Sequence, residues 1–396
     1  MPSAVLLTGA TGFLGRDLLK KLIEELPTQQ TIYCLIRGHE KDSSVSDRPT
    51  ETARARLTKL LIELGYERHD EPKVQRVCAI SGDISHQNLG TQPSDYETLI
   101  QHVSHIFHGA ATVRFDLPLP EARLINVVGT KHILDLTERI HASGQPIRLS
   151  YIGTSFVAGT RKGRILESDL TVEQSFHNTY EQTKAEAEAL VRRAMSEKGL
   201  CATLFRPSII VGNSKTGETS SFKVMYWPLK VFSRGLIPIV PASRAGIVDM
   251  VPIDYVTAAI WELSQRSDTK GGCYHLAAGP DSSTTIGEAL DLAAAFFRVR
   301  KPLFVPIETF ERYVRPVFNF LFRGKRRQAL DAGRVYVPYL NYQASFDTQQ
   351  VKAALVGTGI EPPLVTHYFE RLIQFCVDSD WGKRDPSVSA SRRTRQ

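Results

Sequence analysis

Apolar residues along the chain fall into short runs that alternate with amphipathic stretches. Short apolar runs are typical of buried strands, and apolar residues three and four positions apart are typical of a helix face. Leu18, Leu19, Leu22 and Ile23 form such a face early in the chain. The pattern predicts strands at Val5–Leu7, Thr31–Arg37, Val77–Ile80, around Ile106 and Phe107, at Ile147–Ser155 and at Cys201–Gly212, and helices at Arg16–Leu26, Thr52–Leu64, Glu121–Ile140 and Tyr180–Ser196.

This alternation of strands and helices predicts an α/β fold. Strands separated by helices pair in parallel through right-handed crossovers, so we expect a doubly wound parallel sheet with a smaller C-terminal substrate lobe. The expected organisation is a dinucleotide-binding domain over 1–285 with substrate-lobe insertions at about 213–250. A helical substrate or cap region follows over 286–384, and a disordered basic tail over 385–396.

Composition narrows the function classes. Lys plus Arg exceed Asp plus Glu by 49 − 42 = 7. This weak positive charge suits anionic ligands but is too small for a nucleic-acid-binding protein, so we expect no nucleic-acid partner. The five cysteines are scattered, without a CxxC pair, which is typical of reduced thiols in a cytoplasmic protein. The chain enters a strand almost at once, so we expect no secretory signal. Because no metal-like Cys/His cluster appears, we also expect no metal site.

Three glycines, Gly9, Gly12 and Gly15, lie between the first predicted strand and the first predicted helix. Glycine permits positive φ, and it lets the main chain approach a pyrophosphate resting on the N-terminal N–H groups of the helix. The position of the motif, after a strand and before an amphipathic helix, indicates a dinucleotide site. The alternative is a tight turn that only packs helix against strand.

The residue at the end of the second strand indicates which dinucleotide binds. Folds of this type often place an acid there to hold the ribose 2′-OH, whereas this chain has Arg37. A guanidinium pairs well with a 2′-phosphate, so NADPH is predicted over NADH. The alternative is a surface arginine in a solvated loop.

Tyr180 and Lys184 lie four residues apart on a predicted helix and so share one face. A tyrosine with an ordinary pKa is a poor acid at neutral pH, and an adjacent ammonium group would lower that pKa. Thr154, at the end of the preceding strand, could position a carbonyl oxygen. Thr154, Tyr180 and Lys184 are therefore the predicted catalytic residues, and an exposed helix pair with a buried ring is the alternative.

Several motifs in order resemble an extended short-chain dehydrogenase/reductase with a Rossmann-type fold. The closest likeness is to fatty acyl-CoA reductases and to the thioester-reductase domains of carboxylic acid reductases. The motifs are TGATGFLG, CLIRG, GDISHQNLG, HGAATVRFDLPLPEARLINVVGT, YEQTK and RPSIIVG, with DMVPIDYVTAAI and YHLAAG extending the likeness to about residue 280.

The resemblance implies reduction of an acyl thioester by NADPH, to an aldehyde or further to an alcohol. The acyl donor would be an acyl-CoA or an acyl-carrier protein. It also implies a set of cofactor-binding residues, namely Gly9, Thr11, Gly12, Phe13, Leu14, Gly15, Arg37, Asp83, Ile84, Gly109, Ala110, Ala111, Tyr180, Lys184, Pro207 and Ser208. The sequence departs from the family at Gly153, where a serine is common.

Other functions and motif interpretations stay open at this stage. The chain could instead oxidise or reduce a bulky alcohol or ketone, as steroid- or flavonoid-type relatives do, or sense NADP(H) without turnover. His108 fits a buried core histidine, Asn126 fits a backbone partner, and Arg206 fits an ion pair.

Two stretches bear on the substrate. Glu311–Arg327 fits a peripheral membrane contact or a phosphate-bearing donor, or else a helix covering an acyl tunnel. Ser221–Pro241 fits an acyl-chain site with basic residues for a charged head group, or else a core-packing helix.

Overall fold

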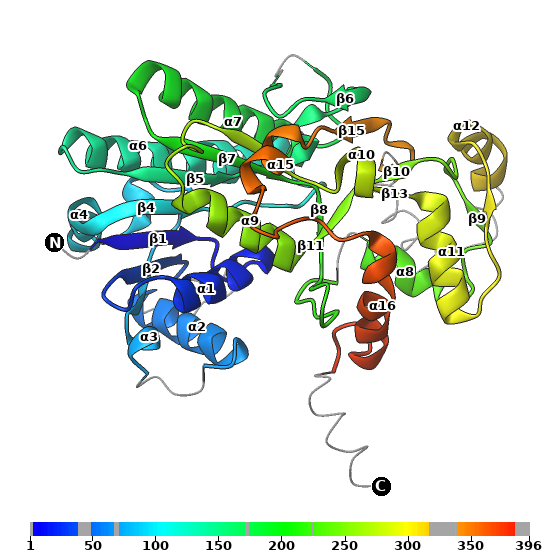
Figure 1. The fold of residues 1–396 in the computed structure, drawn as a ribbon, viewed down its shortest axis with the longest axis horizontal. Coiled ribbons are helices and arrows are strands. Elements are labelled where there is room, and N and C mark those ends of the chain that lie inside the picture. Colours follow the sequence, from blue (N-terminus) through cyan, green and yellow to red (C-terminus); the bar gives the residue numbers. More distant parts are fainter. Residues whose placement is uncertain are drawn as a thin grey trace, which may run out of the picture.

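The fold is built on one parallel sheet, given by a computed structural model that describes residues 3–38, 49–66, 71–170, 174–222, 225–316, 337 and 339–384. In this part of the chain the central sheet has seven strands in the order β12-β7-β5-β4-β1-β2-β3 (Figure 1). All neighbouring pairs are parallel. The strands are β1 Ala4–Thr8, β2 Thr31–Ile36, β3 Val77–Ser81, β4 Val103–His108, β5 Arg148–Ile152, β7 Ala202–Pro207 and β12 Cys273–Leu276.

The direction of strand order reverses next to β1, which pairs with β2 on one side and β4 on the other. Crossovers leave in opposite directions at such a point, and the loops after the strands separate there to form a ligand crevice. Thr8 at the end of β1 is aligned with His108 at the end of β4. The doubly wound parallel sheet predicted from the sequence is therefore confirmed, and it positions a crevice at these carboxyl ends.

Helices cover both faces of the sheet (Figure 1). One buried cluster joins α1, α2 and α9 to one face of the sheet, and a second joins α4, α6 and α7 to the other. The sheet is thus the middle of three layers, with a hydrophobic core on each side. These helices are α1 Phe13–Glu25, α2 Pro49–Glu63, α4 Pro93–His102, α6 Gly129–Ala142, α7 Thr179–Lys198 and α9 Ile253–Gln265, with the short α3 Pro72–Gln75 and η1 Gln87–Gly90 near the third strand.

Two predicted elements differ from the structure. The helix predicted over Glu121–Ile140 begins at Leu119 and contains a π-helical turn, so it reads as α5 Leu119–Arg123, η2 Leu124–Val128 and α6. The strand predicted over Cys201–Gly212 breaks after Pro207, and its second half is β8 Ile209–Val211. The break occurs because β8 leaves the large sheet to pair with β11.

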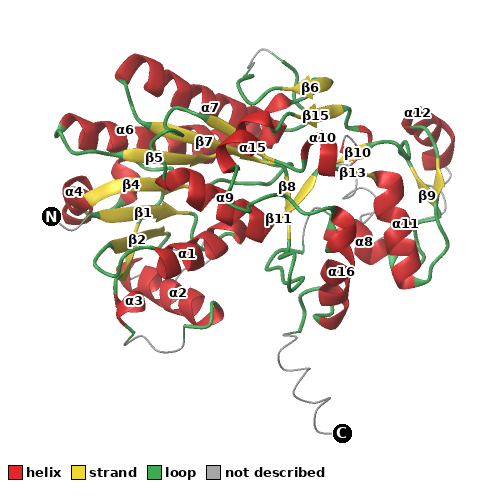
Figure 2. Cartoon of the chain, viewed as in Figure 1, coloured by secondary structure: helices red, strands yellow, loops and turns green. Residues whose placement is uncertain are grey.

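A smaller lobe at the carboxyl edge combines segments that are distant in sequence (Figure 2). Its buried side chains include Phe232 from α8, Ala293 from α11 and Leu372 from α16. The lobe and its surroundings comprise η3 Ser155–Ala158, β6 Gly163–Ile165, α8 Tyr226–Phe232, β9 Ile239–Val240, β10 Ile247–Val248, β11 Met250–Pro252, α10 Gly279–Ser282, β13 Thr284–Thr285, α11 Ile286–Phe297, β14 Leu303–Phe304, α12 Ile307–Thr309, η4 Phe310–Val314, β15 Ala344–Phe346, α15 Gln349–Leu355, η6 Val365–His367 and α16 Phe369–Asp378.

Helix α15 returns from this lobe to the large sheet. Its side chains Val351 and Leu355 are buried in the same core cluster as α1 and α9. The buried carboxylate of Glu167 accepts hydrogen bonds from the backbone N–H groups of Val351 (3.1 Å) and Gln350 (2.7 Å), and from that of His275 in β12 (2.9 Å). The C-terminal part of the chain therefore completes the core on one face of the large sheet.

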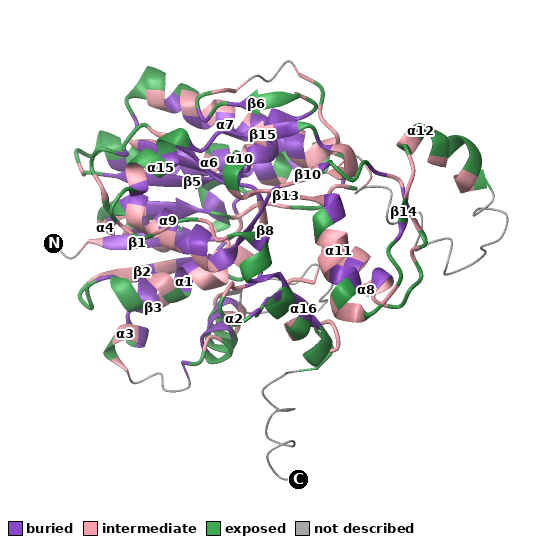
Figure 3. Cartoon of the chain, turned by 45° about the vertical axis from the view of Figure 1, so that its right-hand side comes forward, coloured by how far each residue is buried: buried purple, intermediate pink, exposed green. Residues whose placement is uncertain are grey.

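Several sequence predictions lie outside the described residues. The tail predicted over 385–396 is among them, and only the first six residues of Glu311–Arg327 are described. Tyr313 in that stretch is 61% exposed, in a part of the chain where Figure 3 shows little burial. Within the described residues, no helix is both long and apolar enough to cross a bilayer.

Candidate active site

The glycine-rich turn joins β1 to α1 and packs against the end of β4. Gly9 has φ +81°, and a Cβ there would lie 2.8 Å from the backbone nitrogen of Ala110. A Cβ on Gly15 would lie 2.0 Å from the carbonyl oxygen of Gly9, whereas one on Gly12 would meet that oxygen only at 3.2 Å. Gly9 and Gly15 are therefore required for packing. Gly12 and Thr11 are exposed, which leaves the N-terminus of α1 open to an anion.

The first turn of α1 carries no side-chain cap on its free N–H groups. Such groups need an acceptor, and a pyrophosphate supplies one. Phe13 and Leu14 form that first turn, so the predicted residues from Gly9 to Gly15 occupy one continuous turn. The residues present therefore fit the pyrophosphate of a dinucleotide.

The end of β4 is tied to this turn by Thr8. Its hydroxyl accepts a hydrogen bond from the backbone N–H of Ala110 (3.2 Å) and pairs with Nδ1 of His108 (2.8 Å). Burial lowers the pKa of His108 to about 3, so this ring is neutral. The interpretation of His108 as a core histidine is therefore correct. Gly109, Ala110 and Ala111 follow it at the crevice, as predicted for residues lining a cofactor.

Three predicted cofactor residues follow β2 and β3. Arg37 is exposed directly after β2, and its carbonyl accepts a hydrogen bond from Nη1 of Arg56 on α2 (2.8 Å). Asp83 accepts bonds from the backbone and hydroxyl of Ser85 (2.9 and 2.8 Å). Ile84 is buried against Gly129, where a Cβ would lie 2.6 Å from the Ile84 side chain. The structure thus brings Arg37, Asp83 and Ile84 to the same edge as the glycine-rich turn.

Thr154 and Tyr180 meet at the end of β5. The Thr154 side chain lies beside the Tyr180 hydroxyl, close enough to favour its phenolate and so lower its pKa. The Thr154 hydroxyl also donates a long bond to the Pro207 carbonyl (3.4 Å) and accepts the N–H of Phe156 (3.3 Å). Because these partners are weak, the Thr154 hydroxyl can exchange them for a substrate oxygen.

Lys184 lies one turn further along α7. Its ammonium donates a hydrogen bond to the Ile152 carbonyl (2.8 Å) and stands over the Tyr151 ring, 4.5 Å from its centre. The structure therefore brings Thr154, Tyr180 and Lys184 together around the end of β5, two of them on the helix face that their spacing predicted.

The electrostatics differ from the sequence expectation. Burial raises the pKa of Tyr180 to about 12, which the neighbouring Thr154 side chain only partly offsets. Burial lowers the pKa of Lys184 to about 8, opposed by the nearby Glu188 carboxylate. The expected lowering of the Tyr180 pKa by Lys184 is not found, because the desolvation of the phenolate outweighs it and the ammonium is engaged by the Ile152 carbonyl.

Two further motifs prove structural. Asn126 is buried, accepts the N–H of Thr112 (2.8 Å), and donates to the Thr183 hydroxyl (2.9 Å). Arg206 is buried and forms an ion pair with Glu188 (2.6 Å). The interpretations of Asn126 as a backbone partner and of Arg206 as a member of an ion pair are therefore correct.

Pro207 and Ser208 are the remaining predicted cofactor residues, and they lie at the end of β7 and directly after it. The Pro207 carbonyl accepts a hydrogen bond from the Thr154 hydroxyl, and Ser208 is a buried neighbour of the Asp249 carboxylate. Both residues thus lie at the same edge of the sheet as the other predicted residues.

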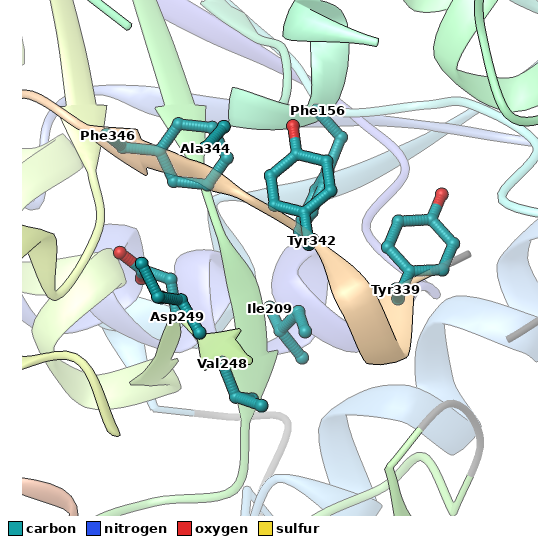
Figure 4. Close-up of a pocket in the computed structure, with 9 residues that line it drawn as sticks. Phe156, Ile209, Val248, Asp249, Tyr339, Tyr342, Ala344 and Phe346 are labelled. Carbon is teal, nitrogen blue, oxygen red and sulfur yellow. The ribbon is translucent and has the colours of Figure 1, made fainter. Parts of the chain in front are cut away.

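An aromatic pocket lined by Phe156, which follows Thr154 by two residues, was missed by the sequence analysis (Figure 4). The cavity, about 20 Å³, is lined by Phe156, Tyr339, Tyr342 and Phe346, with Ile209, Val248 and Asp249 opposite. Tyr339 and Tyr342 come from a segment more than a hundred residues beyond the catalytic helix, as the separation of 161 between Asn178 and Tyr339 indicates. No local pattern signals that approach, and the aromatic residues around 339–346 are the only hint.

The stretch Ser221–Pro241 packs differently from its predicted role as an acyl site. Tyr226 is buried, and Leu229 and Phe232 belong to the lobe core with α16. The Lys230 ammonium stands over the Trp381 ring, 5.7 Å from its centre. These described side chains match the alternative interpretation of a core-packing helix, because their apolar surface is already buried against the lobe.

Comparison with known proteins identifies the family. The sequence pattern of the male sterility protein family, an NAD-binding family, matches residues 7–260. The chain belongs to the male sterility protein family. Fatty acyl-CoA reductase 1 of Xenopus laevis is 29% identical over 290 residues, covering 65% of this chain and 54% of the relative. The chain spans about half the length of this and other fatty acyl-CoA reductases, and 5% of a linear gramicidin synthase subunit from Brevibacillus parabrevis.

Solved structures agree with this family assignment. The terminal R domain from the myxalamid PKS-NRPS biosynthetic pathway matches with a TM-score of 0.79 and 28% identity, covering 96% of this chain and 92% of that domain. A thiolation-reductase di-domain from an archaeal non-ribosomal peptide synthetase has the same fold, with a TM-score of 0.71 and 21% identity over 96% of this chain and 76% of that one. Because the male sterility protein family is an NAD-binding family, the cofactor of this chain is a nicotinamide dinucleotide.

Proposed function

We propose that this protein is an NADPH-dependent reductase that converts an acyl thioester into an aldehyde, with an alcohol as the product of a second round. The observation that carries the proposal is the meeting of Thr154, Tyr180 and Lys184 beside the glycine-rich turn, at the crevice of a male sterility family fold. The likeness to a fatty acyl-CoA reductase and to an assembly-line R domain supports a thioester as the substrate class.

A bound NADPH supplies the hydride that the thioester carbonyl carbon receives. The protein's part is to hold the carbonyl oxygen, on which negative charge develops during the transfer. The neighbouring Thr154 and Tyr180 hydroxyls would face that oxygen and donate hydrogen bonds to it. With its pKa raised to about 12, Tyr180 remains protonated at neutral pH and can deliver its proton to the oxygen. Collapse of the intermediate then expels the thiol.

Lys184 supports this chemistry through charge and position. Its ammonium holds the Ile152 carbonyl, which lies two residues before Thr154 on the same segment. A positive charge near the developing oxyanion stabilises it, and the apolar surroundings strengthen the effect. Lys184 and Tyr180 would also contact the nicotinamide ribose.

Arg37 would cause the protein to prefer NADPH over NADH. Its side chain is exposed at the end of β2, and Arg56 lies against its carbonyl. Two guanidinium groups at the ribose end of the crevice favour a cofactor that carries a 2′-phosphate. Asp83 and Ile84 would flank the adenine.

The acyl donor would be an acyl-carrier protein or an acyl-CoA. The thiolation-reductase di-domain with this fold supports a carrier, and the fatty acyl-CoA reductase relative supports CoA. The five cysteines form no disulfide, which favours a reducing compartment such as the cytoplasm. A peripheral membrane contact through Glu311–Arg327 would fit an acyl substrate delivered from a lipid surface.

Oxidation of NADPH by the purified protein tests the proposal. We expect consumption of reduced nicotinamide with acyl-CoA or carrier-bound acyl thioesters, accompanied by release of free thiol and an aldehyde. Activity confined to a ketone or secondary alcohol would overturn the thioester assignment and support the alternative of an alcohol or ketone oxidoreductase. Binding of NADPH without turnover of either substrate class would indicate a sensor.

A further inference from the structure

Two aromatic rings flank the pair of hydroxyls that would hold the substrate oxygen. Phe115 lies 5.7 Å from Tyr180 between ring centres. Phe156 follows Thr154 by two residues and donates its backbone N–H to the Thr154 hydroxyl. A third ring, that of Tyr339, touches both, at 5.6 Å from Phe115 and 5.3 Å from Phe156. The three rings therefore form one continuous aromatic wall beside the reacting position.

Tyr339 is fixed in this wall through its hydroxyl. The hydroxyl donates a hydrogen bond to a carboxylate oxygen of Glu181 and accepts one from Nδ2 of Asn178 (2.7 Å). Asn178 is the N-cap of α7, and Glu181 directly follows Tyr180. The segment around Tyr339 is thus anchored to the start of the helix that carries the proposed acid.

The Glu181 carboxylate makes this anchor specific. It is fully buried, and its second oxygen accepts the backbone N–H of His177 (2.9 Å) and contacts the His177 ring nitrogen (3.0 Å). A buried carboxylate requires such donors, because an unmatched one is costly. Tyr339 supplies one of them, so its ring position is determined by the polar network and not only by aromatic packing.

Part of this wall borders a small cavity. The cavity between Phe156, Tyr339 and Tyr342 and the facing Ile209 and Val248 is about 20 Å³, close to the volume for a single water-sized group. A straight methylene chain is the apolar group with the smallest cross-section. If the thioester carbonyl lies at Thr154 and Tyr180, a branch on the carbon next to it would face the rings of Phe115 and Tyr339, whose centres are 5.6 Å apart.

We infer that Tyr339 is a specificity-determining residue that selects acyl groups unbranched next to the carbonyl. This inference rests on the proposed function, because it places the thioester carbonyl at Thr154 and Tyr180. The ring of Tyr339 would exclude acyl groups that are wide next to the carbonyl, and its hydroxyl fixes the ring to α7. Straight-chain acyl thioesters are accordingly the substrate class.

The test compares two isomeric thioesters, hexanoyl and 2-ethylbutanoyl N-acetylcysteamine, which differ only in branching. We expect the wild-type kcat/KM to favour the hexanoyl thioester by ~10-fold or more, a usual scale for steric discrimination in an apolar pocket. In Tyr339→Ala we expect this ratio to fall by ~10-fold, towards unity. Tyr339→Phe keeps the ring and should keep the ratio within about 3-fold, with lower stability from the lost donor to Glu181.

Two controls separate selectivity from general damage. Tyr313→Ala removes an exposed tyrosine of the same C-terminal region and should leave the ratio unchanged. The affinity for NADPH should stay within about 2-fold in every variant, since Tyr339 lies at the acyl side. An unchanged ratio in Tyr339→Ala would overturn the inference, and so would an equal fall of the ratio in the Tyr313→Ala control.

A binding measurement distinguishes this inference from the proposed function. The dissociation constants of both thioesters are measured by calorimetry with NADP⁺ bound, so that no hydride transfer occurs. The wild type could bind the two thioesters with different affinities, lose that difference in Tyr339→Ala, and show no turnover. This result would support the role of Tyr339 in selectivity and overturn the assignment as a reductase. Binding without discrimination, in a protein that does turn over, would overturn the pocket alone. Absence of thioester binding to the wild type would overturn both.

Discussion

The ammonium of Lys184 donates a hydrogen bond to the backbone carbonyl of Ile152 across 2.8 Å. This bond ties α7 to the last residue of β5. It also gives the buried ammonium group a polar partner in place of the water that burial removes. Burial still lowers the pKa of Lys184 to about 8, so its charge changes within an accessible pH range.

The rate of thioester reduction should therefore fall as the pH rises through about 8. Above that value Lys184 loses the positive charge that stabilises the oxyanion. In Lys184→Arg the guanidinium stays charged, so the alkaline fall in kcat/KM should move to higher pH. A pH–rate profile of both proteins checks this, and a fall at the same pH in both would assign it to another group.

The stability of the protein should show the same titration. The Lys184 pKa is about 8 when folded and 10.5 ordinarily, so the unfolded state binds more protons between these values. The free energy of unfolding should accordingly rise with pH across that interval, relative to a Lys184→Met variant. Denaturant titrations of both proteins at several pH values measure the difference. A constant difference across the interval would contradict the lowered pKa.

Replacing Tyr180 by phenylalanine should remove the proton donor and leave the pocket nearly intact. We expect kcat to fall by ~10²-fold or more, the usual scale for losing a general acid. The affinity for NADPH, measured by fluorescence titration, should change little. Turnover close to that of the wild type would exclude Tyr180 as the acid. Tyr226→Phe, in the lobe core, is a matched control that removes a buried hydroxyl away from the site.

Replacing Arg37 by alanine should weaken the binding of NADPH much more than that of NADH. Only NADPH carries the phosphate that the guanidinium would pair with, and a charged hydrogen bond contributes about 1.5–3 kcal/mol. The ratio of the two dissociation constants measures the effect. Lys59→Ala, an exposed cation on α2 close to Glu63, serves as the control. An unchanged ratio in Arg37→Ala would show that another residue recognises the ribose.

Two glycine substitutions should separate packing from cofactor binding. Gly15→Ala places a Cβ 2.0 Å from the Gly9 carbonyl oxygen, so we expect loss of stability or of folding. Gly12→Ala meets the same oxygen at 3.2 Å, so the protein should fold and bind the dinucleotide more weakly. Thermal unfolding and NADPH titration report the two effects. Equal stability of the two variants would contradict the assignment.

Local sequence patterns predicted the elements that local forces determine. Leu18 and Leu22 mark the buried face of α1, and the β1 turn glycines mark the crevice, because both signals lie within one short segment. Thr154 and Tyr180 could be predicted to lie close together because one residue stands at the end of β5 and the other on the helix that follows, α7. The π-helical turn at Leu124–Val128 and the separate helix α4 were missed, since neither carries a distinctive local period.

Features that depend on distant segments could not be predicted. Tyr339 reaches Glu181 across 158 residues, and nothing near either residue signals the contact. The pKa of Tyr180 was expected to fall because Lys184 is close in sequence. Its rise depends on how deeply the folded chain buries the phenol, which a sequence does not contain. The aromatic pocket therefore needed the structure, whereas the position of the glycine-rich turn did not.

Because α15 completes the core on one face of the large sheet, synthesis of the chain and its division into fragments are constrained. Val351 and Leu355 fill a core whose other buried residues lie before residue 280. The Glu167 carboxylate accepts hydrogen bonds from the N–H groups of Gln350 and Val351, which are synthesised much later. A nascent chain emerging from the ribosome would hold an open apolar surface and an unmatched carboxylate until its last quarter is synthesised. Expression fragments that stop near residue 285 should consequently aggregate or recruit chaperones. Supplying the missing C-terminal piece in trans is the remedy that the architecture suggests.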